Sequence, residues 1–268
     1  MKSQLGKERR LEQIFSHNGK AFVVPVDDLL ICGPSFQLAD YREKIPLLSD
    51  HRISAVLGFP GVFNQFYDDL KQKPWIINLT TSTIRSNHTF KRLSIPLKSA
   101  IAFGCTAVAV HVNVTDVEEG EMIRSLANVS CECQEYGIPL MAIIYARKRA
   151  LDGVDDNYLL LKEKDNCQYT SIIAHACRIA VELGADIIKT NYTGSKDGFE
   201  KVVYAAGDVP IIIAGGSYVE EEKLLDDLRN ALIAGASGLC FGRNFFYRKN
   251  IPEFIEKVSG IVYGTEIY

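Results

Sequence analysis

The chain has 268 residues, of which 47% are hydrophobic and 24% are charged, so it is long enough to bury a sizeable core. Its net charge of −3 does not favour binding to nucleic acid or anionic lipid, which positively charged proteins bind, so we expect no nucleic-acid or membrane partner. No apolar run approaches the roughly 18 residues that a membrane-spanning helix needs, and the charged N-terminus lacks the apolar core of a signal peptide.

The 7 cysteines are scattered along the chain without a repeated C-x-x-C spacing. This pattern disfavours a disulfide framework or a zinc cluster, because both need cysteines at characteristic spacings. The histidines also show no metal-ligand spacing, so we expect no metal. Reduced thiols indicate a cytoplasmic protein.

Short apolar runs rich in Val and Ile recur along the chain, and each is followed by a longer amphipathic or polar segment. The runs cover residues 21–26, 54–58, 75–80, 107–114, 139–145, 185–192, 209–216 and 237–244. Their near-continuous hydrophobicity is typical of parallel strands covered by helices. The clearest helices are predicted over residues 117–137, 171–185 and 220–236, where the chain turns into the next strand after a glycine.

Eight such strand–helix units without a Pro/Gly/Ser-rich linker predict one α/β domain over residues 1–268, a (β/α)₈ TIM barrel with an N-terminal helical extension. The alternative is an open doubly wound sheet. That fold normally has a Gly-rich turn after its first strand, and the "VDDLLICGP" of this chain is not one. The long charged segment 145–170 is predicted to form a flap over the mouth of the barrel.

In this fold the functional site lies at the carboxyl ends of the strands, so polar residues there are candidates. They are Asp27 and Asp28 after the first strand, Tyr145 and Arg147 at the fifth, and Lys189 on the sixth. His111 on the fourth strand is expected to be a hydrogen-bonded interior residue rather than a base, and the polar loop 82–89 is expected to line the pocket.

The last two strands end in glycine-containing loops that fit a phosphate group. Glycine lets backbone N–H groups approach an anion, and Arg243 can add paired charge-assisted hydrogen bonds. Barrels frequently bind phosphate with these two loops. The predicted phosphate-binding residues are Gly215, Gly216, Ser217, Gly242 and Arg243. The alternative is that the glycines only turn the chain while Arg243 pairs with a carboxylate.

Lys189 interrupts the apolar run "ADIIKTNYTG". One interpretation is a lysine that reaches from the strand end into water. The other is a desolvated amine whose pKa is lowered by burial and by nearby cations, and which forms an iminium with a phosphorylated ketone. Tyr145 would then move protons during C–C bond formation or cleavage, and Asp27 would orient the amine or carry a proton.

With these residues assembled, the chain resembles the class I aldolases of the DhnA/DeoC/LacD group, most closely the archaeal-type fructose-bisphosphate aldolases and the aminodideoxyheptulosonate synthases. The resemblance runs in order through "GKERRLEQIF", "VVPVDDLLICGP", "ECQEYGIPLMAIIYAR", "ACRIAVELGADIIKTNYTG", "VPIIIAGG" and "FGRNFFY". It implies an aldehyde-lyase without metal or other cofactor, acting on sugar-phosphate and aldehyde substrates. It also implies a homo-oligomer, a ring-type decamer in the family.

The resemblance implies that Lys189 is the Schiff-base residue, Tyr145 the proton donor and acceptor, and Asp27 the acid of the first strand. Two departures lie where the second substrate should sit. Asp27-Asp28-Leu29 replaces the family's Asp-His-Gly, and Tyr145-Ala146-Arg147-Lys148 replaces Tyr-Pro-Arg-Gly. The second carboxylate is expected to raise the pKa of Asp27 or to attract a cationic group of the substrate.

The leading functional hypothesis is a Schiff-base aldolase that joins or cleaves a phosphorylated ketone, of the dihydroxyacetone phosphate or fructose 1,6-bisphosphate type, and an aldehyde. Asp28 would recognise an ammonium-bearing aldehyde such as aspartate semialdehyde. One alternative is a transaldolase-type 2-amino-3,7-dideoxy-D-threo-hept-6-ulosonate synthase with another donor. An alternative of a different class is a barrel that binds a phosphorylated ligand without turnover.

Overall fold

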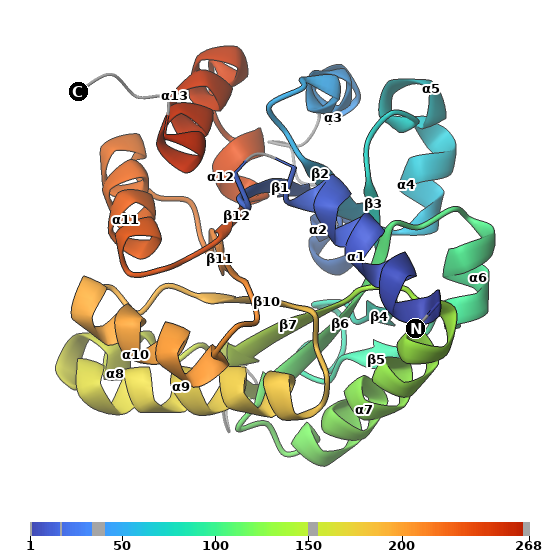
Figure 1. The fold of residues 1–268 in the computed structure, drawn as a ribbon. Helices are drawn as coiled ribbons and strands as arrows, with labels where there is room; N and C mark the ends of the chain where they lie inside the picture. The colour runs from blue at the N-terminus through green and yellow to red at the C-terminus, as the bar shows by residue number, and fades with distance from the viewer. Residues whose placement is uncertain (1, 17, 34–40, 150–154, 265–268) are drawn as a thin grey trace.

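The computed structural model describes residues 2–16, 18–33, 41–149 and 155–264. Eight parallel strands close into a barrel in the order β1-β12-β11-β10-β7-β6-β3-β2, with helices around it (Figure 1). The strands are β1 (Ala21–Pro25), β2 (Ala55–Gly58), β3 (Trp75–Asn78), β6 (Ala107–Val114), β7 (Leu140–Ala146), β10 (Ile187–Asn191), β11 (Ile211–Ala214) and β12 (Gly238–Cys240). The predicted TIM barrel and all of its eight strands are confirmed.

The helices of the outer layer follow the strands along the chain. They are α2 (Asp28–Cys32), α3 (Tyr41–Lys44), a 3₁₀ helix (Ile45–Ser49), α4 (Pro60–Gln65), α5 (Tyr67–Leu70), α6 (Leu97–Ala102), α7 (Glu119–Tyr136), α8 (Leu159–Lys164), α9 (Asn166–Glu182), α10 (Lys196–Ala206), α11 (Glu221–Ile233), α12 (Arg243–Phe246) and α13 (Ile251–Tyr263). None of the described helices is long and apolar enough to cross a membrane.

Buried residues form two layers, one between the strands and the helices and one inside the barrel. The inner layer takes alternate residues of each strand, because successive side chains of a strand point to opposite faces. On β10 it contains Ile187, and two residues further on the same face carries Lys189 to the mouth. The apolar barrel interior therefore ends in polar side chains at its carboxyl end.

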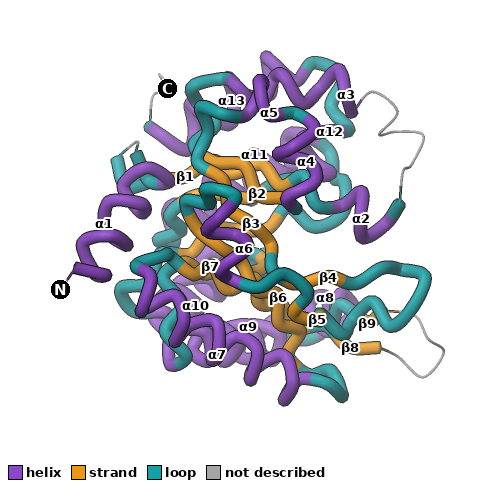
Figure 2. Tube along the Cα trace, turned by 90° about the vertical axis from the view of Figure 1, so that its right-hand side faces the viewer, coloured by secondary structure: helices purple, strands orange, loops and turns teal. Residues whose placement is uncertain are grey.

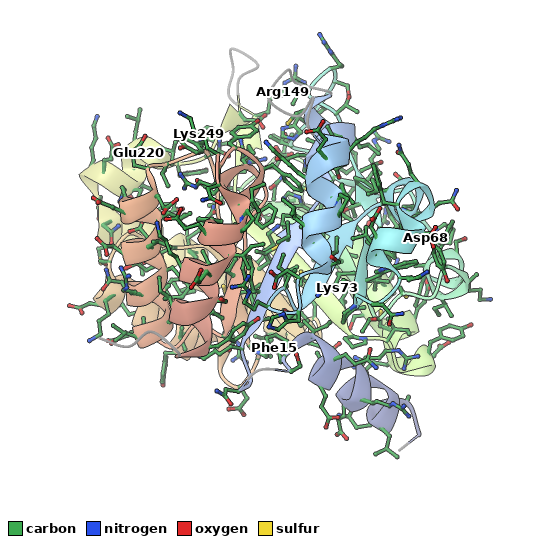
Figure 3. The ribbon with its side chains drawn as sticks, turned by 90° about the horizontal axis from the view of Figure 1, so that it is seen from above. Phe15, Asp68, Lys73, Arg149, Glu220 and Lys249 are labelled. Atoms are coloured by element: carbon green, nitrogen blue, oxygen red, sulfur yellow. The ribbon has the colours of Figure 1, made fainter. Side chains whose placement is uncertain are left out.

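The N-terminal extension is the helix α1 (Lys2–Ile14), which lies across the amino end of the barrel. Its Ile14 belongs to the inner apolar layer, and Leu11 and Phe15 pack against that layer. Figure 2 shows α1 on the side of the molecule opposite the small sheets near the mouth, and Figure 3 places Phe15 and Arg149 at opposite ends. The mouth of the barrel is therefore the end away from α1.

Part of the segment expected as a flap forms regular structure. The strand β8 (Lys148–Arg149) pairs with β9 (Asp155–Asp156), next to the strand pair β4 (Thr80–Thr81) and β5 (Arg92–Leu93) in Figure 2. Residues 150–154 lie outside the described part of the chain. The segment continues into α8 and the start of α9, which begins at Asn166 because the Asp165 side chain accepts a hydrogen bond from the N–H of Gln168 at 2.9 Å.

A buried ion pair fastens α1 to the barrel, and its loss is expected to destabilise the fold. Lys7 is only 2% exposed and its Nζ lies 2.8 Å from Asp186 Oδ2, which also accepts the N–H of Leu140 at 2.8 Å. Replacing Lys7 by Met leaves that carboxylate short of a partner, so Lys7→Met should lower the free energy of unfolding by about 2–3 kcal/mol in a urea titration. The exposed Lys201→Met is the matched control. An unchanged urea midpoint for Lys7→Met would contradict this role.

Candidate active site

A pocket of about 300 Å³ opens at the carboxyl ends of the strands. The structure brings together nine of the ten predicted site residues in its lining: Asp27, Asp28, Tyr145, Arg147, Lys189, Gly215, Gly216, Gly242 and Arg243. Ser217 is exposed and does not line the cavity. Ile84 and His88 also line it, which confirms that the polar loop 82–89 contributes to the pocket.

Lys189 lies on the inward face of β10 and is 7% exposed, so it does not reach into water. The lowered pKa expected for this lysine is wrong. Burial disfavours the ammonium, but the Asp27 carboxylate beside it, and Cys240 and Tyr145 when they ionise, raise the pKa above its ordinary value. In the resting site the lysine is therefore an ammonium, and it needs a proton acceptor before it can act as a nucleophile.

Asp27 lies between β1 and α2 as a buried carboxyl, and Asn78 at the end of β3 holds it in place. The Asn78 side-chain amide donates to Asp27 Oδ2 at 3.0 Å. The Asn78 carbonyl oxygen in turn accepts from the N–H of Thr80 at 3.1 Å and from its hydroxyl at 2.9 Å. Burial raises the pKa of Asp27, and Asp28 raises it further, as the sequence predicted, while the charge of Lys189 opposes both.

Tyr145 lies on the inward face of β7, one strand from Lys189 in the barrel order. Its ring meets the His111 ring edge to face, with centroids 4.9 Å apart, and the guanidinium carbon of Arg147 lies 5.8 Å from its centroid. Burial raises the pKa of the Tyr145 phenol, so it carries its proton at neutral pH. The arrangement provides a fixed hydroxyl donor beside the lysine.

His111 is buried, as predicted, and it lines the pocket. Its Nε2 is hydrogen-bonded to Asn113 Oδ1 at 3.0 Å. Burial lowers the pKa of the ring well below its usual value, and the cations Lys91 and Arg147 lower it further. His111 is therefore a neutral side chain that packs against Tyr145.

The loops after β11 and β12 are joined by Asn244, a residue that the sequence analysis did not single out. Its side-chain amide donates to the carbonyls of Gly215 at 2.8 Å and Ser217 at 2.9 Å. Arg243 Nε lies 3.6 Å from Asp28 Oδ2. This ion pair places Asp28 beside Arg243, on the side of the pocket where the phosphate is predicted to bind.

Lys91 and Cys240 were also missed, although both line the pocket. Cys240 is buried beside Lys189, and burial raises the pKa of its thiol to about 11. The inward alternation of the strand positions would have indicated Cys240, but no pattern in the sequence marks Lys91. The described residues contain no group of three His, Cys, Asp or Glu side chains that could hold a metal ion.

The sequence matches a family model described as DeoC/LacD family aldolase over residues 21–248. A 2-amino-3,7-dideoxy-D-threo-hept-6-ulosonate synthase of Archaeoglobus fulgidus is 33% identical over 97% of this chain and 92% of its own. A 2-amino-4,5-dihydroxy-6-oxo-7-(phosphonooxy)heptanoate synthase of Streptomyces griseus is 27% identical over 96% of this chain and 90% of its own.

Among solved structures, the fold is similar to that of an archaeal fructose-1,6-bisphosphate aldolase with its catalytic Lys covalently bound to the carbinolamine intermediate of the substrate. The TM-score is 0.80 and the sequence identity is 26%, and the match covers 96% of this chain and 99% of the other.

Proposed function

Because this chain belongs to the DeoC/LacD family of aldolases, we propose that Lys189 forms a Schiff base with a phosphorylated ketone and that the resulting enamine adds to an aldehyde. The observation that carries the proposal is that Lys189 is buried at the mouth of the barrel and shares its pocket with Asp27 and Tyr145. In the reverse direction the same groups would cleave the C–C bond.

The residues of the pocket divide the chemistry among them. Asp27 takes a proton from the Lys189 ammonium, which its raised pKa favours, and the free amine attacks the ketone carbonyl. Tyr145 gives its proton to the hydroxyl of the carbinolamine, which leaves as water to give the iminium, and the resulting phenolate takes a proton from the adjacent carbon to give the enamine. The enamine attacks the aldehyde carbon while Tyr145 donates its proton to the aldehyde oxygen. Water then releases the product and restores the Lys189 ammonium, and Asp27 returns its proton to Tyr145.

The donor phosphate is assigned to the loops after β11 and β12, with Gly215, Gly216, Ser217, Gly242 and Arg243. A Cβ at Gly242 would lie 3.1 Å from Pro25 Cγ, so a larger residue would crowd the turn at this end of the pocket.

Because the whole reaction runs through the lysine, we assign no metal or other cofactor to it. We further propose a cytoplasmic homo-oligomer, a state that sedimentation can test.

The name of the Streptomyces griseus relative describes a seven-carbon product with a carboxylate and an amine at one end and a phosphate at the other. Such a product results when the enamine of dihydroxyacetone phosphate adds to aspartate semialdehyde, which is the acceptor we propose here. The synthase from Archaeoglobus fulgidus keeps the transaldolase-type alternative open. A three-carbon fragment that stays on the enzyme for transfer would favour that alternative. Asp28 is paired with Arg243 on the phosphate side of the pocket, so the predicted recognition of the acceptor ammonium by Asp28 is not part of this proposal.

Reductive trapping tests the proposed function. The protein is mixed with dihydroxyacetone phosphate, and separately with fructose 1,6-bisphosphate, and borohydride is added. We expect dihydroxyacetone phosphate to give a stable secondary amine on Lys189, located by peptide mass, because borohydride reduces the iminium. A chelator should not change the yield. No adduct with either ketone would contradict Schiff-base chemistry on these donors and favour the binding-only alternative.

A further inference from the structure

Lys91 is a buried cation with no role in the chemistry described above. It follows the polar loop between β3 and β6, is 2% exposed, and lines the pocket. Its Nζ donates to Ser82 Oγ at 2.6 Å, and that hydroxyl donates in turn to the carbonyl of His88 at 3.0 Å. Within the described ranges no carboxylate forms an ion pair with Lys91. A buried ammonium without a counter-ion disfavours the folded state, so a ligand is a natural source of the missing negative charge.

Arg147 is the second cation on this side of the pocket. Its Nη1 lies 3.9 Å from Asp155 Oδ2, and its Nε donates to Asn157 Oδ1. Burial lowers the pKa of Lys91 to about 7, and the charge of Arg147 contributes in the same direction. Two neighbouring cations that repel each other in a buried site would both be stabilised by one anion bound between them.

The barrel order places Lys91 away from the predicted phosphate site. The segment that carries Lys91 joins β3 to β6, and these strands lie across the ring of eight from β11 and β12. The strands of Lys189 and Tyr145, β10 and β7, lie between the two sides. The donor is held by its phosphate at β11 and β12 and is bonded to Lys189. An acceptor that approaches this donor from the other side of the pocket therefore extends its far end towards Lys91.

We propose that Lys91 and Arg147 form a second anion-binding subsite that takes the carboxylate at the far end of the acceptor aldehyde. This inference rests on the proposed function for its orientation of the two substrates. The charges favour a carboxylate over a phosphate. Asp155 pairs with Arg147, and Lys91 has no ion-pair partner among the described residues, so at most one net positive charge remains for the ligand, which matches a monoanion.

A stability measurement separates a ligand-binding role of Lys91 from a structural one. Replacing a buried, unpaired ammonium by an apolar side chain of similar size is expected to be neutral or stabilising. Lys91→Met should therefore unfold at the same temperature as the unaltered protein or higher, although it weakens acceptor use. A lysine required for the fold would instead give a lower unfolding temperature with Met.

The decisive experiment compares two acceptors of the same length in the presence of dihydroxyacetone phosphate. Succinate semialdehyde has a terminal carboxylate and butanal does not. We expect Lys91→Met to raise the KM for succinate semialdehyde by about 10- to 100-fold, the range for loss of a hydrogen bond between charged groups, and to leave the KM for butanal unchanged. Lys91→Arg should restore part of the preference, and the exposed Lys98→Met should have no effect.

The possible outcomes are distinct. An equal change for both acceptors, or no change for either, would overturn the subsite. A preference for glyceraldehyde 3-phosphate over succinate semialdehyde that depends on Lys91 would overturn the choice of a carboxylate and assign a phosphate to the same cations. Borohydride trapping on Lys189 in the Lys91→Met variant reports the Schiff-base step separately. If the unaltered protein shows no adduct, the proposed function fails, and calorimetric titration with succinate still shows whether Lys91 binds a carboxylate.

Discussion

Replacement of Lys189 by arginine is expected to abolish turnover, with kcat falling about 10⁴-fold or more, as for removal of a covalent nucleophile. A guanidinium remains protonated in proteins and cannot supply the free amine that iminium formation requires. The positive charge beside Asp27 is retained, so the electrostatic balance of the pocket changes less than with an apolar residue. Steady-state rates of product formation and borohydride trapping measure the two consequences together.

The control for this prediction is Lys201→Arg, the same exchange at an exposed position on α10. It should keep full activity and the adduct on Lys189. Retained turnover in Lys189→Arg, with a borohydride adduct on another lysine, would contradict our assignment. Lys91 is the residue to inspect first in that event, because it is the other buried lysine among the described lining residues of the pocket.

The raised pKa of Lys189 explains why the lysine and its carboxylate have to be considered together. A permanently neutral amine would need no base, whereas this lysine holds a proton, and in the proposed mechanism Asp27 accepts it. Burial prepares Asp27 for that task because it makes the carboxylate a stronger base than a solvated one. Asn78 fixes the carboxylate through one hydrogen bond of 3.0 Å, so we regard it as a positioning residue.

The sequence was sufficient for the barrel and for most of the site because both depend on local patterns. Runs of Val and Ile predict buried parallel strands, and a polar residue at the end of such a run lies at the mouth. The direction of the Lys189 pKa shift was not predictable in this way. It depends on Tyr145 of β7, Cys240 of β12 and Asp27 after β1, which meet the lysine only when the barrel closes.

Lys91 and Asn244 show a second limit of prediction from sequence. Lys91 lies in a polar segment where an exposed lysine is the normal expectation, and only the tertiary structure buries it beneath the loop 82–89. Asn244 follows the predicted phosphate-binding arginine, but its hydrogen bonds run back to a loop 27 to 29 residues earlier in the chain. Neither contact leaves a periodic signal in the sequence.

The replacement of Tyr145 by phenylalanine is expected to lower kcat by about 10²- to 10⁴-fold, the usual contribution of a positioned proton donor. Its raised pKa keeps the phenol protonated through the neutral range, so it can donate to the aldehyde oxygen as the new bond forms. The edge-to-face contact with His111 involves the ring and should persist in the variant. Tyr145→Phe should therefore fold normally and bind the ketone with little change in KM.

Trapping experiments distinguish this effect from loss of the Schiff base. With dihydroxyacetone phosphate and borohydride, Tyr145→Phe should still give an adduct on Lys189, although more slowly, because carbinolamine dehydration also needs a proton. Tyr204→Phe, at a position on α10 that is 89% exposed, is the matched control and should behave as the unaltered protein. If Tyr145→Phe retained full kcat, the proton would have to come from Asp27, whose buried carboxyl would then act in both halves of the reaction.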